Sequence, residues 1–284
     1  MIFLVLAVVA STCNHLLFKA FARMRVDLLS AITANFGACV IIGYSSSIGS
    51  TSVFSQNWYP FSIVQGSLFV GCLFLIGQTT AKQGLSVASL ATRLSVAIPT
   101  VMAFLLYDDL ATMAKIIGIL AALLALYLSS GDSTESLVLI RIKSMLPLAL
   151  FAVFGLYATL LKFVQARYLN PGTYHTYVMA SFLAAFLLSG ATLTWRLFGK
   201  RQTCKVKDLL WGLVLGCTNY GSVYFLIRAL GMPGWQSSQV FPTVSTAVVG
   251  LSSLAAWAFF QERFHHRMLP ALAIGVGAIV LVNL

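Results

Sequence analysis

Charged side chains are scarce in this sequence, since Asp, Glu, Lys and Arg make up 9% of its 284 residues. An ordinary soluble domain carries about 25%. Several long stretches contain none of these four residue types: 28–81, 168–195, 209–227, 229–261 and 268–284. Because about 20 apolar residues cross the hydrocarbon core of a bilayer, runs of this length predict membrane-spanning helices. The chain is therefore predicted to be an integral membrane protein.

Acidic residues are the rarest charged type, and their absence from the apolar runs excludes one class of transporter. All seven lie in predicted connections or at segment ends, so no carboxylate is predicted at membrane depth. A pump that exports lipophilic cations against protons is expected to need a buried carboxylate, which neutralises the drug and carries the returning proton. The sequence therefore argues against a cationic multidrug pump.

The patterns that define several other classes are also missing. The five cysteines are an odd number and four of them lie within apolar runs, which argues against a disulfide framework or a CxxC metal site. The sequence contains no HExxH motif, no nucleophile elbow and no phosphate-binding glycine loop. These absences argue against an enzyme, and no cofactor is predicted.

What the sequence has in abundance is apolar residues, 59% of the total, together with a net charge of +11. In a soluble chain this charge would indicate a nucleic-acid partner. Here most cations lie at the ends of apolar segments, so they report membrane topology and no nucleic-acid partner is predicted.

Turn residues, charges and aromatic residues divide the chain into ten apolar segments, which are too long and continuously apolar for a barrel. The fold class predicted is an all-α integral membrane protein with ten transmembrane helices. The first segment has no preceding Lys or Arg and no clear cleavage site, so we expect it to stay in place as a span rather than act as a signal peptide. The segments are 1–21, 28–47, 60–82, 86–107, 112–130, 145–165, 173–198, 207–230, 236–260 and 267–284.

The two halves of the chain resemble each other. Ile98-Pro99-Thr100-Val101 recurs as Phe241-Pro242-Thr243-Val244, and Leu17-Phe18-Lys19 recurs as Leu160-Leu161-Lys162, both at the same offset of half the chain. Since each half holds five segments, the second half must enter the membrane from the opposite side, which predicts an inverted repeat. The predicted domains are 1–130 and 145–284, joined by 131–144.

These features resemble the drug/metabolite transporter superfamily, specifically its ten-helix EamA type. The residues that carry the resemblance are the prolines of the fourth and ninth segments, Phe259-Phe260-Gln261-Glu262-Arg263-Phe264 with the glycine-rich segment 271–277, and a weaker counterpart at 107–110 and 115–118. The resemblance implies ten helices and a central cavity lined by the first, third, fourth, sixth, eighth and ninth. Asp109 and Glu262 follow their prolines at different distances, so the two halves do not superpose residue by residue.

The membrane orientation has two conflicting indications, although a cell membrane, inner or plasma, is the expected location. The excess of Lys and Arg on the connections after odd-numbered segments favours a cytoplasmic position for those connections, with both termini outside. The family resemblance implies cytoplasmic termini.

Arg93 is the cation that stands alone inside an apolar segment. An arginine that faces lipid is costly, at least about 2.5 kcal/mol at the bilayer centre, whereas one that faces a watery cavity is not. We therefore expect Arg93 to line a substrate route. Two alternatives are a structural partner, such as a carbonyl at a helix end, and an extended side chain that reaches the nearer interface.

Other polar residues form stripes at helical spacing, and such stripes must face protein or water. His15 follows Ser11 in the first segment, and Tyr220, Tyr224 and Arg228 share a face of the eighth. Each has a structural alternative, since amides and hydroxyls often only form hydrogen bonds between neighbouring helices. His15 is a candidate proton carrier, and it has the same structural alternative. The predicted substrate-binding residues besides Arg93 are Asn14, His15, Gln78, Tyr157, Asn219, Tyr220 and Gln239, with Lys82 and Arg228 as further cations.

Pro99 and Pro242 are predicted gating residues, because a proline removes a helical hydrogen bond and permits a kink, although a kink need not move. Gly212 and Gly216 form a GxxxG pair, for which packing inside the bundle is favoured over a dimer face. The spacing of Glu262, His265 and His266 would allow a metal. We expect these three residues to be solvated, and no metal site is predicted.

The function predicted from these residues is secondary transport of a small metabolite by alternating access. The substrate expected is an exported amino-acid-like compound or another anionic or zwitterionic one, with Arg93 attracting its negative group. Coupling to protons or to a counter-substrate is left open. The alternative is a non-transporting membrane receptor or accessory protein whose cavity holds a ligand or lipid.

Overall fold

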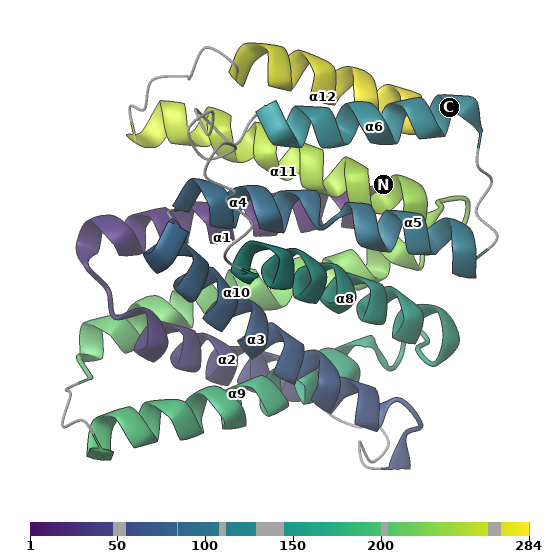
Figure 1. Ribbon diagram of the computed structural model, residues 1–284. Coiled ribbons are helices and arrows are strands. Elements are labelled where there is room, and N and C mark those ends of the chain that lie inside the picture. Colours follow the sequence, from purple (N-terminus) through teal and green to yellow (C-terminus); the bar gives the residue numbers. More distant parts are fainter. Residues whose placement is uncertain are drawn as a thin grey trace. The chain divides into compact units, whose positions relative to one another are not determined.

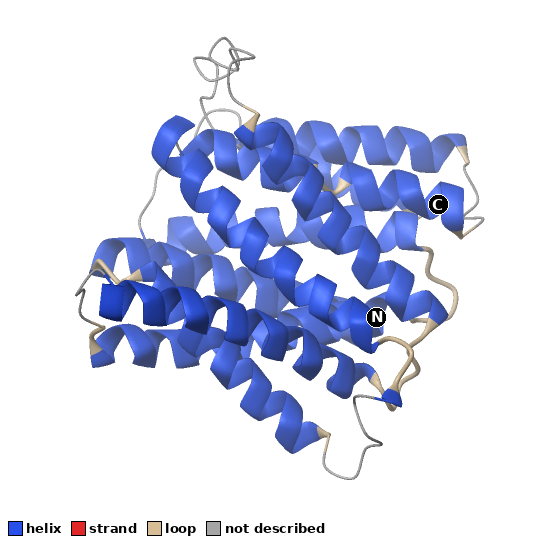
Figure 2. Cartoon of the chain, turned by 60° about the horizontal axis from the view of Figure 1, so that its bottom comes forward, coloured by secondary structure: helices blue, strands red, loops and turns tan. Residues whose placement is uncertain are grey.

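The computed structural model describes residues 1–47, 55–83, 85–107, 112–128, 145–199, 204–260 and 268–283. Within these ranges the regular structure is helical and contains no strand (Figure 1, Figure 2). The all-helical fold is thus confirmed for the described part of the chain. Glu262, His265 and His266, together with the predicted connection 131–144, lie outside the described residues.

Among the described residues, six helices are long and apolar enough to cross a membrane, as expected of a membrane protein. They are α1 (Ile2–Met24), α2 (Leu28–Ser46), α3 (Tyr59–Gln83), α8 (Leu146–Arg167), α9 (Tyr174–Gly199) and α10 (Val206–Leu230). The remaining helices are α4 (Leu85–Leu94), α5 (Ala97–Leu106), α6 (Met113–Leu128), α11 (Ser237–Phe260) and α12 (Met268–Val282). The predicted fourth span, 86–107, is therefore two short helices, α4 and α5, and not one continuous helix.

The chain forms two compact units. The first unit contains residues 1–70 and 163–231, and the second contains 71–162 and 232–284. Each unit takes segments from both halves of the sequence, so compactness does not follow the predicted repeat boundary. An inverted repeat is defined by the direction in which each half crosses the membrane, which the two compact units do not report. The inverted repeat therefore stays a prediction.

In the first unit α10 packs against α1 and α2, and α2 packs against α9. Glycines permit the close approach of α10 to α2. A Cβ atom at Gly212 would overlap the carbonyl oxygen of Ala31, and one at Gly216 would lie 2.5 Å from the Cβ of Ala38. The GxxxG pair therefore packs inside the chain, which confirms that interpretation over the dimer face.

In the second unit α6 and α12 lie side by side, and α11 contacts α5, α6 and α12 (Figure 1). Gly118 permits the contact of α6 with α12, because a Cβ atom there would lie 2.7 Å from the backbone nitrogen of Val282. Gly155 likewise permits the contact of α8 with α5, because a Cβ atom there would overlap the side chain of Ile98. Both contacts need a residue without a side chain.

Candidate functional site

Arg93 lies in the last turn of α4, and its side chain is half-buried. The backbone carbonyls at a helix C-terminus carry partial negative charge, which favours a cation at this position. The structure thus gives the guanidinium a favourable position at a helix end, one of the alternatives that the sequence left open.

The helix ends beside Arg93 because of Pro99. Proline has no N–H to donate to the carbonyl four residues earlier, and its ring clashes with that carbonyl. The carbonyl in question belongs to Ser95, and it accepts instead from the backbone N–H of Ile98 at 3.0 Å. Ser95 and Val96 therefore form a turn between α4 and α5. Pro99 thus interrupts the helix over two residues, Ser95 and Val96, although Val96 keeps right-handed helical backbone angles.

The broken helix packs against α8 through small and aromatic side chains. Ala88, Ala91 and Leu150 form a buried cluster, and Phe151 and Phe154 pack on it. Tyr157 lies edge-on to Phe154, with ring centroids 6.5 Å apart. Tyr157 therefore neighbours, along α8, one of the rings that pack on this cluster.

Gln239 and Pro242, both on α11, take structural positions. Gln239 accepts from the backbone N–H of Gln236 at 3.0 Å and donates from Nε2 to the carbonyl oxygen of Val282 at 3.0 Å. The first bond lies at the start of α11, and the second joins α11 to the end of α12. Pro242 is buried inside α11, which continues through it. The side chain of Gln78 is half-buried on α3, and that of Lys82 is exposed.

Asn14 and Asn219 hold helices of the first unit together. Asn14 donates to Ser222 Oγ at 3.2 Å and accepts from Thr218 Oγ1 at 2.5 Å, which joins α1 to α10. Asn219 donates to Asn35 Oδ1 at 3.2 Å, which joins α10 to α2. In this structure both amides act between helices, the structural alternative for these residues.

His15 is exposed on α1, and its Nδ1 lies 2.9 Å from the carbonyl oxygen of Ser11 on the same helix. An Nδ1–H tautomer would donate to that carbonyl, as is common for polar side chains one turn along a membrane helix. The proposed role of His15 as a proton carrier receives no support from this contact.

The first unit also contains a polar and aromatic cluster that was only partly recognised in the sequence. We define the Arg228 cluster as Phe3, His175, Tyr220, Tyr224 and Arg228. The Nδ1 atom of His175 lies 2.6 Å from the hydroxyl of Tyr220, and its ring stacks on Tyr224 with centroids 4.0 Å apart. The guanidinium carbon of Arg228 lies 4.4 Å from the centroid of the Phe3 ring.

His175 was missed because helical spacing groups residues along one helix and does not reveal which helices are neighbours. Tyr220, Tyr224 and Arg228 are one stripe of α10, whereas His175 comes from α9 and Phe3 from α1. Lys115 was missed for the same reason. It is buried on α6, within the predicted segment 112–130, and donates from Nζ to Gln236 Oε1 at 2.5 Å.

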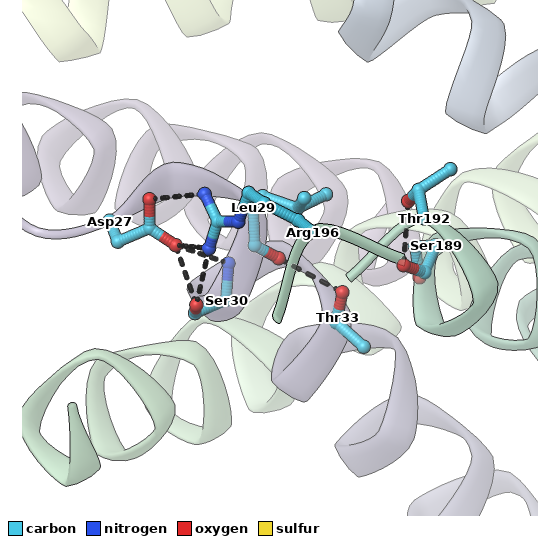
Figure 3. Close-up of polar contacts among 7 residues, drawn as sticks. All are labelled: Asp27, Leu29, Ser30, Thr33, Ser189, Thr192 and Arg196. Atoms are coloured by element: carbon cyan, nitrogen blue, oxygen red, sulfur yellow. Dashed lines mark hydrogen bonds and ion pairs between the residues drawn. The ribbon is translucent and has the colours of Figure 1, made fainter. Parts of the chain in front are cut away.

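An ion pair lies at the end of the first unit opposite to the Arg228 cluster (Figure 3). Asp27 caps the N-terminus of α2 by accepting from the Ser30 N–H at 3.0 Å, and it pairs with Arg196 of α9. Hydrogen bonds from the Arg196 guanidinium lower the pKa of Asp27 from its ordinary 3.8 to about 2. Because the folded-state pKa is lowered, the pair stabilises the fold above the ordinary pKa and this contribution is lost as pH falls toward 2.

The predicted site residues are divided between the two units. Asn14, His15, Asn219 and Tyr220 belong to the first, and Gln78, Arg93, Tyr157 and Gln239 to the second. Within the units, the structure brings Tyr220 into the Arg228 cluster and places Tyr157 against Phe154 on α8. A single site that includes all eight residues stays a prediction.

Comparison with known proteins gives the fold a precedent. No family model matches the chain. A protein of Haemophilus influenzae described as "Uncharacterized protein" is 22% identical over 268 residues, which are 92% of this chain and 90% of the relative. A solved structure described as "Crystal structure of protein" has a TM-score of 0.72 at 18% identity and covers 99% of this chain and 94% of its own. At that identity the likeness shows the fold alone.

Proposed function

We propose that this protein is a secondary transporter that moves a small anionic or zwitterionic metabolite across the cell membrane by alternating access. The observation that carries the proposal is the break between α4 and α5 directly after Arg93. Broken helices in membrane proteins are tolerated where they line a cavity or are buried in protein, and secondary transporters use their ends to bind substrates.

The charges at the break favour a negative ligand. The guanidinium of Arg93 offsets the negative C-terminal end of α4. The N-terminal end of α5 adds little, because the N–H of Ile98 donates to the Ser95 carbonyl and Pro99 has no N–H. The guanidinium is therefore the group that attracts a carboxylate or a phosphate, and Tyr157 and Phe154 offer an apolar surface for the rest of the substrate.

Helix contacts within the units support two related halves. If the halves are equivalent, α2 corresponds to α9 and α3 to α10. The contact of α10 with α2 then requires a matching contact of α3 with α9. Both contacts are made through glycine: Gly212 meets Ala31 on α2, and a Cβ atom at Gly66 of α3 would lie 2.7 Å from the Cβ of Ala184 on α9.

The test is uptake by proteoliposomes that contain the purified protein. Amino acids, sugar phosphates and nucleobases are first screened for thermal stabilisation of the protein, and the compounds that stabilise it are then offered as radiolabelled substrates. We expect saturable uptake that Arg93→Ala abolishes and Arg93→Lys partly preserves, because lysine keeps the charge without the planar fork.

The matched control is Arg167→Ala, which removes an exposed arginine from the last turn of α8. It should transport at the wild-type rate. Normal uptake by a correctly folded Arg93→Ala variant would refute the role of Arg93. Stabilisation by a ligand with no flux of any compound would instead assign the protein to the class of non-transporting receptors or accessory proteins.

A further inference from the structure

Arg228 carries a positive charge without an acidic partner in its unit. Among the described residues of the first unit the acidic ones are Asp27 and Asp208. Asp208 lies 20 residues earlier on the same helix, which is about 30 Å away at 1.5 Å per residue. Asp27 pairs with Arg196. The side chain of Arg228 is half-buried, and among the described residues of its unit no carboxylate lies within reach of it.

The donors of Arg228 are also largely unused. A guanidinium has five N–H groups in a planar fork. Within the described structure one of them points to a protein acceptor, the hydroxyl of Tyr224, at a long 3.4 Å. Aromatic rings cover the guanidinium instead: Phe3 at 4.4 Å, Tyr224 at 5.9 Å and Tyr174 at 6.0 Å from the ring centroid to the guanidinium carbon. Rings attract the cation through their faces and leave its N–H edge available.

Two helix N-termini contribute to the same location. Phe3 is the second residue of α1, and Tyr174 is the first residue of α9. The N-terminal end of a helix carries partial positive charge and attracts anions. Arg228 itself lies in the last turn of α10, whose C-terminal carbonyls offset part of its charge. The two N-termini add partial positive charge to the remainder, so the net potential at this location is positive.

We propose that the Arg228 cluster is an oxyanion-binding site, in which the guanidinium binds a carboxylate or phosphate through its N–H edge and the rings of Phe3 and Tyr224 pack against the rest of the ligand. Bidentate pairing with a carboxylate or a phosphate is the contact that a guanidinium makes best. The oxyanion comes from a soluble carboxylate compound or from the headgroup of an anionic lipid. Binding there does not require that the protein transports its ligand.

The experiment measures the thermal unfolding of the full chain in a neutral detergent while a ligand is titrated. The soluble probe is benzoate, and benzyl alcohol is the matched ligand with the same ring and no charge. The lipid probe is phosphatidylglycerol, with phosphatidylcholine as its zwitterionic control. We expect benzoate or phosphatidylglycerol to raise the melting temperature in a saturable way, and the two control compounds to have no such effect.

Substitutions then locate the site. Arg228→Ala should weaken the binding of the active probe by about ten- to hundredfold, the effect of losing a hydrogen bond to a charged group. Arg228→Lys should weaken it less, since the charge remains. Arg167→Ala, which removes an exposed arginine of the same unit at the end of α8, should leave binding unchanged.

The outcomes separate the two sources and the alternative. Saturation by benzoate that Arg228→Ala weakens identifies a site for soluble carboxylates, and the same result with phosphatidylglycerol alone identifies a lipid site. Equal binding by wild type and a folded Arg228→Ala variant would overturn the proposal, as would no stabilisation by either anion. The melting temperature without ligand reports whether each variant is folded. Failure of the uptake assay above would leave these binding results unaffected.

Discussion

Two proline-containing segments with nearly the same local sequence have different structures. Ile98-Pro99-Thr100-Val101 follows a break between α4 and α5, whereas Phe241-Pro242-Thr243-Val244 lies within the continuous helix α11. Both segments belong to the second unit, and α5 contacts α11. The same motif therefore disrupts one helix and not the other.

The position of each proline in its helix explains the difference. A proline clashes with the carbonyl four residues earlier. For Pro242 that carbonyl belongs to Ser238, the second residue of α11, so the chain before the helix can absorb the displacement. For Pro99 it belongs to Ser95, which follows the 10-residue helix α4. A preceding helix that is already packed cannot shift, so the backbone breaks.

The residues six positions before the two prolines also differ. Arg93 lies at the break in the first half, and the offset that relates the two prolines places Gln236 at the corresponding position of the second half. Gln236 precedes α11 and accepts a bond from the buried Lys115. The first half therefore presents a charge at a helix end, and the second half uses the equivalent position to hold α6 against α11.

The largest effect is expected at the glycine that accommodates the break. Gly155→Ala should lower the melting temperature in detergent by about 6 °C, because its Cβ would overlap Ile98 and overpacking costs up to about 3 kcal/mol. The control on the continuous helix is Gly250→Ala, whose Cβ would meet only the flexible tip of Leu272 at 3.3 Å. Equal melting temperatures would show that the contact at the break is not tight.

The next largest effect is expected on transport. Pro99→Ala restores an N–H for the Ser95 carbonyl and favours a continuous helix by about 1 to 3 kcal/mol, so uptake should fall at least about fivefold. The melting temperature should be unchanged or higher. Pro242→Ala should alter uptake less than about twofold, since α11 is already continuous. Similar uptake by both variants would contradict a functional role for the break.

A smaller effect is expected when the stability of a Gln236 variant is compared with that of an Arg93 variant. Gln236→Leu leaves the buried ammonium of Lys115 without its acceptor and should destabilise the fold by about 1 to 3 kcal/mol, measured by chemical denaturation in detergent. Arg93→Ala should leave the stability nearly unchanged and abolish ligand-induced stabilisation. A reversal of these two results would mean that Arg93 is the structural residue and Gln236 is the one that contacts the ligand.

The smallest effect compares two serines that bond to a carbonyl three residues earlier. Ser95 donates to the Thr92 carbonyl at 2.6 Å beside the break, and Ser252 donates to the Val249 carbonyl at 3.1 Å within α11. Ser95→Ala should cost about 1 kcal/mol, because the carbonyls at a helix end have fewer backbone partners. Ser252→Ala should be neutral or stabilise slightly, since alanine favours a helix. Equal effects would argue against a capping role for Ser95.

Much of the fold could be predicted from the sequence because a bilayer restricts what apolar segments can do. Runs without charge must be helices with their backbone bonds satisfied internally. The prediction of a helical membrane protein is confirmed for the described residues, and the internal packing of Gly212 and Gly216 is confirmed as well. The candidate site was less predictable, because spacing along one helix located Tyr220, Tyr224 and Arg228 but not their partners Phe3 and His175.

By itself the sequence determined where charge is absent, and therefore which segments are apolar helices and where proline removes a hydrogen bond. Only the tertiary structure decided that Pro99 breaks its helix and Pro242 does not, that Asn14 and Asn219 join helices, and that rings from α1 and α9 surround Arg228. The physical reason is that helix formation depends on nearby residues, whereas the consequences of a lost hydrogen bond or an isolated charge depend on which other helices are in contact.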